Sequence, residues 1–176
     1  LDNQQNGHDY FCADFNDNNS VTEAAKKITE KYNIDILINN TGGPPAGPAQ
    51  NANEDEFFSA FRNHLVNNHI LARHCIPSMK SNHWGRVINI ISTSVKQPLP
   101  NLGVSNTIRG AVANWSKTMA NELAPYGITV NNILPGATNT ERLKSIIENK
   151  SKNTSRELNE VSGGMLKEIP AGRFAD

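Results

Sequence analysis

Three hydroxyl side chains in a row, Ser92-Thr93-Ser94, are the first feature of this sequence that could do chemistry. The segment before them, residues 87–91, is rich in β-branched residues and shows almost no alternation, which is typical of a central parallel strand covered on both faces. In open α/β sheets, ligands bind outside the carboxyl ends of such strands. The hydroxyls therefore either line a ligand site or only cap the loop that leaves the strand.

A second candidate pair, Ser105 and Arg109, lies on a helix predicted for residues 104–123. Apolar residues recur there at steps of three and four, which indicates one continuous apolar face: Val104, Ile108, Val112, Trp115, Met119 and Leu123. Because Ser105 and Arg109 are four residues apart, their side chains lie one turn apart on a common face. Such a pair either belongs to a site or marks a solvated helix edge.

Histidines are concentrated in residues 54–79, which predict one or two further helices with these residues on the buried side: Phe57, Phe61, Leu65, Leu71 and Cys75. His64 lies beside this apolar stripe, either as a functional residue or as a core histidine whose hydrogen bonds are satisfied. His64, His69 and His74 are five residues apart, so each is turned by about 140° from the last on a helix. They do not share a face, and we predict no metal site there.

Four motifs occur in an order and spacing that resemble the short-chain dehydrogenase/reductase family, most of all its ketoacyl-carrier-protein-reductase-like branch. They are Asn39-Asn40-Thr41-Gly42, the segment from Gly85 to Ser92, the segment from Asn121 to Asn131, and Pro135-Gly136. The resemblance covers essentially the whole chain. It implies a doubly wound parallel sheet of the Rossmann type, NAD or NADP as cofactor, and reduction of a carbonyl or oxidation of an alcohol on a small-molecule substrate.

The family's catalytic positions are mostly altered in this sequence. In the family, a serine at the strand end is followed thirteen residues later by a tyrosine and then, four residues on, by a lysine; counting from Ser92 gives Ser105 and Arg109. The family's asparagine, twenty-eight residues before the serine, falls on His64. An alkyl hydroxyl is a far weaker acid than a phenol, so Ser105 is a poor general acid at neutral pH. Arg109 can still bind ribose hydroxyls, and His64 is the candidate for a new proton donor because imidazole titrates near pH 7.

These substitutions leave two hypotheses about function. One is an oxidoreductase of this family with a non-standard proton donor. The other is a catalytically inactive nucleotide-binding or scaffold protein of the same fold. Hydrolysis by Ser92 or Ser105 is disfavoured, because the sequence shows no nucleophile elbow and no evident base–orienter pair.

Cofactor contacts are implied by the resemblance at residues that follow predicted strands. Asp14 ends a short β-like run at residues 10–13, and in the family this position approaches the adenine ring; by itself Asp14 reads as a turn residue. A strand at residues 34–38 delivers Asn40, Thr41 and Gly42, where a glycine permits close approach of a cofactor, unless the loop is an ordinary connection.

A last strand is predicted at residues 128–134, and the family places a Pro-Gly turn and hydroxyls after it, beside the nicotinamide. The matching residues are Pro135, Gly136, Thr138 and Thr140. Thr140 is alternatively only a helix N-cap. The resemblance implies that the polar segment 145–168 is a substrate lid, whereas its composition alone supports only a flexible helical excursion.

The first helix is predicted to open with a capping box, Ser20-Val21-Thr22-Glu23. Its inward side chains are expected to be Val21, Ala24, Ala25, Ile28 and Tyr32. No glycine-rich phosphate loop precedes Asp9, and the chain stops where the family continues. We therefore expect residues 1–176 to be one incomplete Rossmann-like domain, a fragment truncated at both ends, with the segment that selects NAD or NADP outside it.

Composition indicates which binding partners and which cell compartment to expect. Seventeen basic and seventeen acidic residues cancel, which argues against nucleic acid or an anionic membrane as partner. No secretory signal or membrane span is present, and Cys12 and Cys75 are expected to be buried, reduced thiols, so we predict a cytoplasmic protein. In the family, the helices at 54–79 and 105–123 often form subunit interfaces. A homodimer or homotetramer is therefore expected, with Phe58, Ile70 and Trp115 as candidate contacts.

Overall fold

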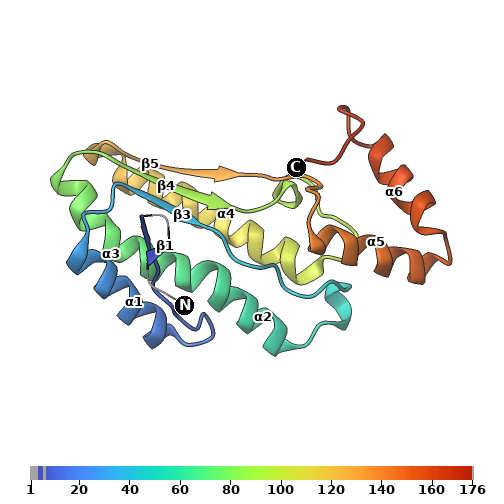
Figure 1. The fold of residues 1–176 in the computed structure, drawn as a ribbon, viewed down its shortest axis with the longest axis horizontal. Coiled ribbons are helices and arrows are strands. Elements are labelled where there is room, and N and C mark those ends of the chain that lie inside the picture. Colours follow the sequence, from blue (N-terminus) through green and yellow to red (C-terminus); the bar gives the residue numbers. More distant parts are fainter. Residues whose placement is uncertain (1–3, 6, 176) are drawn as a thin grey trace. The chain divides into compact units, whose positions relative to one another are not determined.

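The computed structural model describes residues 4, 5 and 7–175, with side chains from residue 7 onward. It divides into two compact units, Leu1–Ile133 and Leu134–Asp176. The first unit holds a sheet and its covering helices, and the second holds two further helices (Figure 1).

The first unit is built on a parallel sheet with the strand order β3–β4–β5. Its strands are β3 (Ile36–Asn39), β4 (Gly85–Ile90) and β5 (Ile128–Ile133). Helical crossovers join them, as parallel strands require. The first crossover contains α2 (Glu54–Phe61), a π-helical turn η2 (Arg62–Val66) and α3 (Asn67–Ser81), and the second is α4 (Gly103–Leu123). The predicted Rossmann-like parallel sheet, with the segment before Ser92 as a central strand, is confirmed.

Helices lie along one face of this sheet (Figure 1). The core between them is formed by Cys75, Met79, Val87, Leu123, Ile128 and Val130. The opposite face carries Ile36, Ile38 and Ile133, which are 49–60% exposed. Burial therefore alternates along β4, and the expectation that this strand is covered on both faces is wrong for the described residues.

Helix α1 (Asn18–Lys31) begins earlier than the predicted capping box. The Asp17 carboxylate accepts a hydrogen bond from the Asn19 backbone N–H at 2.9 Å and is the N-cap. Ser20 instead accepts from the Asp14 backbone N–H at 2.9 Å, so its hydroxyl closes the preceding turn. Tyr32 is exposed rather than inward because the helix ends at Lys31.

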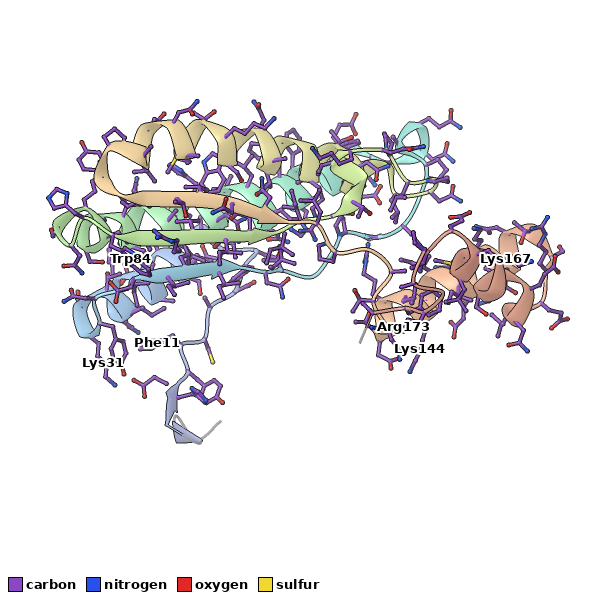
Figure 2. All side chains as sticks on the ribbon, turned by 90° about the horizontal axis from the view of Figure 1, so that it is seen from above. Phe11, Lys31, Trp84, Lys144, Lys167 and Arg173 are labelled. Atoms are coloured by element: carbon purple, nitrogen blue, oxygen red, sulfur yellow. The ribbon has the colours of Figure 1, made fainter. Side chains whose placement is uncertain are left out.

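Residues 10–13 do not form the predicted strand. The strands before α1 in the described chain are two short antiparallel ones, β1 (Gln4–Gln5) and β2 (His8–Asp9). Figure 2 shows the segment that carries Phe11 running without a strand beside it. Since a strand exists only where a neighbour pairs with it, the segment stays irregular, and Cys12 is exposed instead of buried.

The buried positions of the first crossover include the predicted Cys75 but otherwise differ from the predicted ones. They are Ala60, His64, Asn67, Asn68, Ala72, Cys75 and Met79. Phe61, expected inside, is 42% exposed. Hydropathy favoured the phenylalanine, whereas most of the buried positions carry small or polar side chains.

The second unit contains α5 (Glu141–Thr154) and α6 (Leu158–Lys167), which pack on each other. Each buries one apolar side chain, Leu143 and Val161. The range predicted as the lid, residues 145–168, includes most residues of these two helices. The lid and the single incomplete domain both stay predictions. Among the described residues, no helix has the length and apolar character that a membrane crossing needs.

Candidate functional site

Ser92 stands where β4 ends. It has extended backbone angles and is half-buried, and its Oγ accepts a hydrogen bond from the Ser94 backbone N–H at 3.1 Å, which opens the 3₁₀ turn η3 (Thr93–Val95). A hydroxyl has one hydrogen and two lone pairs. Within the described chain, no acceptor takes the Ser92 hydrogen, so the hydroxyl both caps the loop and can donate to a ligand oxygen.

Ser105 and Arg109 face the protein interior. They are 7% and 9% exposed, so the alternative of a solvated helix edge is wrong. Arg109 donates from Nη1 to the Ile90 carbonyl at 2.7 Å, which fixes the guanidinium against the last residue of β4. Helix α4 packs against both η3 and η2. The elements that carry the four candidate catalytic residues therefore contact one another.

His64 is the buried residue of the π-turn, at 3% exposure. Its Nδ1 lies 2.5 Å from the Thr41 Oγ1, and the imidazole tautomer decides which of the two donates. Single π-helical turns are rare and occur often at functional sites. The histidine is thus hydrogen-bonded to a hydroxyl of the predicted cofactor loop. It is a buried residue with a hydrogen-bond partner, as the core interpretation expects, and that partner belongs to the predicted site, as the functional interpretation expects.

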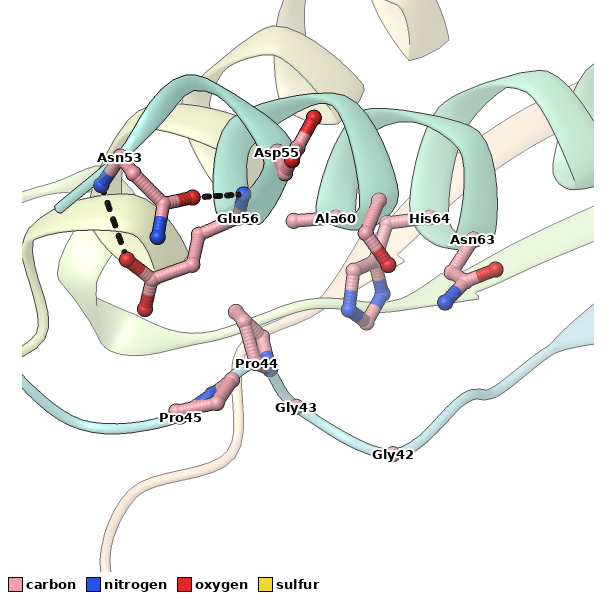
Figure 3. Close-up of a pocket in the computed structure, with 11 residues that line it drawn as sticks. Gly42, Gly43, Pro44, Pro45, Asn53, Asp55, Glu56, Ala60, Asn63 and His64 are labelled. Carbon is pink, nitrogen blue, oxygen red and sulfur yellow. Dashed lines mark hydrogen bonds between the residues drawn. The ribbon is translucent and has the colours of Figure 1, made fainter. Parts of the chain in front are cut away.

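A hollow of about 440 Å³ lies between that loop and α2 (Figure 3). Its walls are formed by Gly42, Gly43, Pro44, Pro45, Asn53, Asp55, Glu56, Ser59, Ala60, Asn63 and His64. A reciprocal capping box fixes the start of α2: Glu56 N–H donates to Asn53 Oδ1 at 3.0 Å, and Asn53 N–H donates to Glu56 Oε2 at 2.9 Å. A Cβ at Gly42 would meet nothing within 4 Å, so open space lies beside this residue. The volume is within the range of small-molecule pockets.

Asp14 is exposed, and its carboxylate accepts from the Asn16 backbone N–H at 2.9 Å, as a turn aspartate does. Side chains from the first crossover hold this turn: Arg62 Nη1 donates to the Asn16 carbonyl at 3.0 Å, and Asn67 Nδ2 donates to the Phe15 carbonyl at 2.8 Å. Sequence reasoning missed these two residues. The signal for Asn67 was a polar side chain at a buried helix position, whereas Arg62 is exposed and gave no such signal.

A chain of buried amides crosses the sheet and was also missed. Asn39, Asn89 and Asn132 are in register on the three strands. Asn39 Nδ2 donates to Asn89 Oδ1 at 2.8 Å, and Asn89 Nδ2 donates to the Ser116 hydroxyl of α4 at 2.9 Å. The signal was one asparagine near the carboxyl end of each predicted strand.

The remaining predicted cofactor residues are placed as follows. Asn40 is exposed directly after β3, whereas Thr41 is half-buried against His64. In the second unit, Thr140 is the N-cap of α5 and accepts from the Leu143 N–H at 3.4 Å, which is the alternative that the sequence left open. For Pro135, Gly136 and Thr138, cofactor contact stays a prediction. In the part of the chain that the structure describes, no group of three or more histidine, cysteine, aspartate or glutamate residues could hold a metal ion.

Comparison with known proteins assigns the class. The sequence profile of the short chain dehydrogenase family matches residues 1–151, and the chain belongs to that family.

Two curated relatives are reductases. The NADPH-dependent reductase BacG of Bacillus subtilis is 29% identical over 164 residues, and the 3-oxoacyl-[acyl-carrier-protein] reductase FabG of Haemophilus influenzae is 29% identical over 163 residues. They match 93% and 91% of this chain, which spans 63% and 62% of their own length.

Solved structures agree with the fold. One is a crystal structure of YwfH, an NADPH-dependent reductase involved in bacilysin biosynthesis. The match covers 93% of this chain and 63% of the YwfH chain, with a TM-score of 0.83 and 28% identity. Another is a structure from Beutenbergia cavernae described as a gluconate 5-dehydrogenase, and the match covers 93% of this chain and 62% of that chain with a TM-score of 0.82. Because the identity is 24%, this match supports the fold alone.

Proposed function

We propose that the whole gene product is an oxidoreductase that transfers hydride between NAD or NADP and a small carbonyl or alcohol, with His64 in place of a phenol as proton donor. The observation that carries this proposal is the burial of Ser105 and Arg109 on a helix that contacts the turn after Ser92 and the turn of His64. Residues that had lost any connection with a site would more readily be solvated.

The residues present fit a nucleotide. Open space beside Gly42, the hollow at the Gly42–Gly43 loop and the fixed guanidinium of Arg109 supply close backbone approach and hydrogen-bond donors. Asn40, Thr41, Gly42 and Arg109 would hold it, with Asp14 on the adenine side. When bound, a nicotinamide supplies or accepts the hydride.

This chain's own groups would manage the carbonyl oxygen and its proton. In the reducing direction, Ser92 donates a hydrogen bond to the oxygen, which polarises the carbonyl before hydride reaches carbon. His64, which Thr41 orients through its Nδ1, delivers the proton that completes the alcohol, directly or through a water held by Ser105. Arg109 stays charged and holds ribose hydroxyls.

The experiment is calorimetric titration of the whole gene product with NADH and NADPH, followed by cofactor oxidation over a panel of ketones and ketoacyl thioesters. Binding together with turnover on at least one substrate is the expected result. The thioesters are included because FabG of Haemophilus influenzae is a 3-oxoacyl-[acyl-carrier-protein] reductase. Absence of binding to both nucleotides would refute the proposal.

A second candidate function is a nucleotide-binding protein without turnover, and Ser105 favours it because an alkyl hydroxyl is too weak an acid to replace a phenol. Binding without turnover on any substrate is its expected result. The double substitution Ser105→Tyr with Arg109→Lys then becomes informative. Turnover gained by that variant alone would indicate that the fold was kept while the chemistry was lost.

We further propose that the protein is cytoplasmic and associates with copies of itself. Phe58 is 65% exposed, and Ile70 and Trp115 are half-buried, so α2, α3 and α4 offer apolar surface to a second copy. A homodimer or homotetramer in light scattering, dissociated by Phe58→Glu, would support this part.

A further inference from the structure

Two loops that carry proposed site residues are joined backbone to backbone. The loop after β3 contains Thr41 and Gly42, and the loop after β4 leads to Ser105. They meet at Gly47, whose N–H donates to the Asn101 carbonyl at 2.7 Å and whose carbonyl accepts from the Gly103 N–H at 2.9 Å. A parallel bridge pairs Gly47 with Leu102 between these two bonds.

The bond from Gly103 also determines where α4 begins. Leu102 is the N-cap of α4, and its side chain makes no capping hydrogen bond. The first N–H groups of a helix have no partner inside the helix and need one from elsewhere. The Gly47 carbonyl provides it for Gly103, the first residue of α4, so the loop after β3 caps the helix that carries Ser105.

Space, rather than conformational freedom, requires glycine at position 103. A Cβ added to Gly103 would lie 2.3 Å from the Ala49 backbone nitrogen and 2.5 Å from the Ala49 Cα. Both are main-chain atoms, which cannot rotate away as the end of a side chain can. Any larger residue must push the 47–49 segment and the start of α4 apart.

We propose that Gly103 is a positioning residue. It lets the loop that carries Thr41 and Gly42 pack directly on the first turn of α4, so that this loop and Ser105 stay at fixed positions relative to each other. Gly103 touches no reacting atom and acts through Gly47 and Ala49. The inference rests on the proposed function only for its nucleotide readout.

The test compares two identical substitutions in the whole gene product, Gly103→Ala and Gly110→Ala. Gly110 lies two turns further along the same helix, and a Cβ there would meet nothing within 4 Å, so it is the matched control. Titration with NADH and NADPH is measured on both variants, together with amide hydrogen exchange over residues 44–49, where Ala46, Gly47 and Ala49 carry the exchanging amides because the other three residues are prolines. We expect Gly103→Ala to bind the preferred nucleotide at least fivefold more weakly and to exchange faster at 44–49, and Gly110→Ala to match the wild type in both.

A folded Gly103→Ala variant with wild-type exchange at 44–49 and nucleotide affinity within twofold would overturn the inference. If that variant does not fold, Asn106→Ala replaces it: Asn106 Nδ2 donates to the Leu99 carbonyl at 2.9 Å and so holds to α4 the loop after β4, whose Asn101 carbonyl accepts from Gly47. Faster exchange at 44–49 then supports the inference, and unchanged exchange refutes it. Should the wild type bind neither nucleotide, the proposed function fails, while the exchange comparison still decides the role of Gly103.

Discussion

Replacing Ser116 with alanine tests whether the buried amide chain stabilises the fold. Ser116 is 1% exposed; its Oγ accepts from Asn89 Nδ2 at 2.9 Å and can donate to Asn132 Oδ1 at 2.7 Å. Leaving a buried polar group without its partner costs about 1–3 kcal/mol. Asn89 Nδ2 keeps a long contact to Asn132 Oδ1 at 3.4 Å, which limits the loss. Alanine is also a better helix former than serine, by about 0.5 kcal/mol.

The net expectation is a fall of about 1–2 kcal/mol in the free energy of unfolding. Urea denaturation of the whole gene product, with the slope unchanged, measures it. Thr118→Ala is the control, because Thr118 is exposed on the same helix and its Oγ1 donates to the Asn114 carbonyl at 3.3 Å, as Ser116 Oγ can to the Val112 carbonyl at 2.8 Å, while among the described residues it has no bond to the amide chain. It should change stability by less than about 0.5 kcal/mol. Equal effects of the two substitutions would refute the reasoning.

Three further predictions concern residues outside the site. Gly127→Ala should destabilise by roughly 1–3 kcal/mol in the same urea assay, because φ is +69° and a Cβ would lie 2.3 Å from the His83 carbonyl oxygen; a neutral result would contradict the close contact. Burial lowers the pKa of His74, so the unfolded chain binds the proton more readily and stability falls as the pH drops below the unfolded value of about 6.5; His74→Gln should decline less, and identical pH curves would argue against this. Burial raises the pKa of the Cys75 thiol to about 11, so iodoacetamide at pH 8 should leave Cys75 unmodified in the native protein and alkylate it in urea, with equal rates excluding the buried thiol.

The sequence was most informative where apolar residues repeat. The apolar runs at residues 34–38, 87–91 and 128–134 predicted the three parallel strands, and the three-to-four spacing of α4 predicted its buried face. These patterns arise because a sheet and a helix must each bury one side. The spacing of apolar residues therefore indicates which side of each element is packed.

Polar residues inside the protein were the part that sequence could not place. His64, Asn67 and Ser116 occupy buried positions that a hydropathy pattern assigns to apolar side chains, and only their hydrogen-bond partners on distant segments make burial acceptable. Those partners lie 16–52 residues away in the sequence. The buried positions of the first crossover were partly missed for the same reason.

For the candidate site, the resemblance predicted which residues stand at the family's catalytic positions, and the structure added their burial and anchoring. Ser105 and Arg109 alone were compatible with a solvated helix edge. Their exposure of 7% and 9% removed that alternative, and the contact of His64 with Thr41 linked the proposed proton donor to the cofactor loop.

The most direct test of the proposed proton route is turnover of the whole gene product with His64→Ala beside His69→Ala. His69 is an exposed histidine on α3 and serves as the matched control. Loss of a positioned general acid lowers the rate by roughly 10²–10⁴-fold, so we expect His64→Ala to lose turnover to that extent at saturating nucleotide, and His69→Ala to behave as the wild type. Undiminished turnover in His64→Ala would contradict the account.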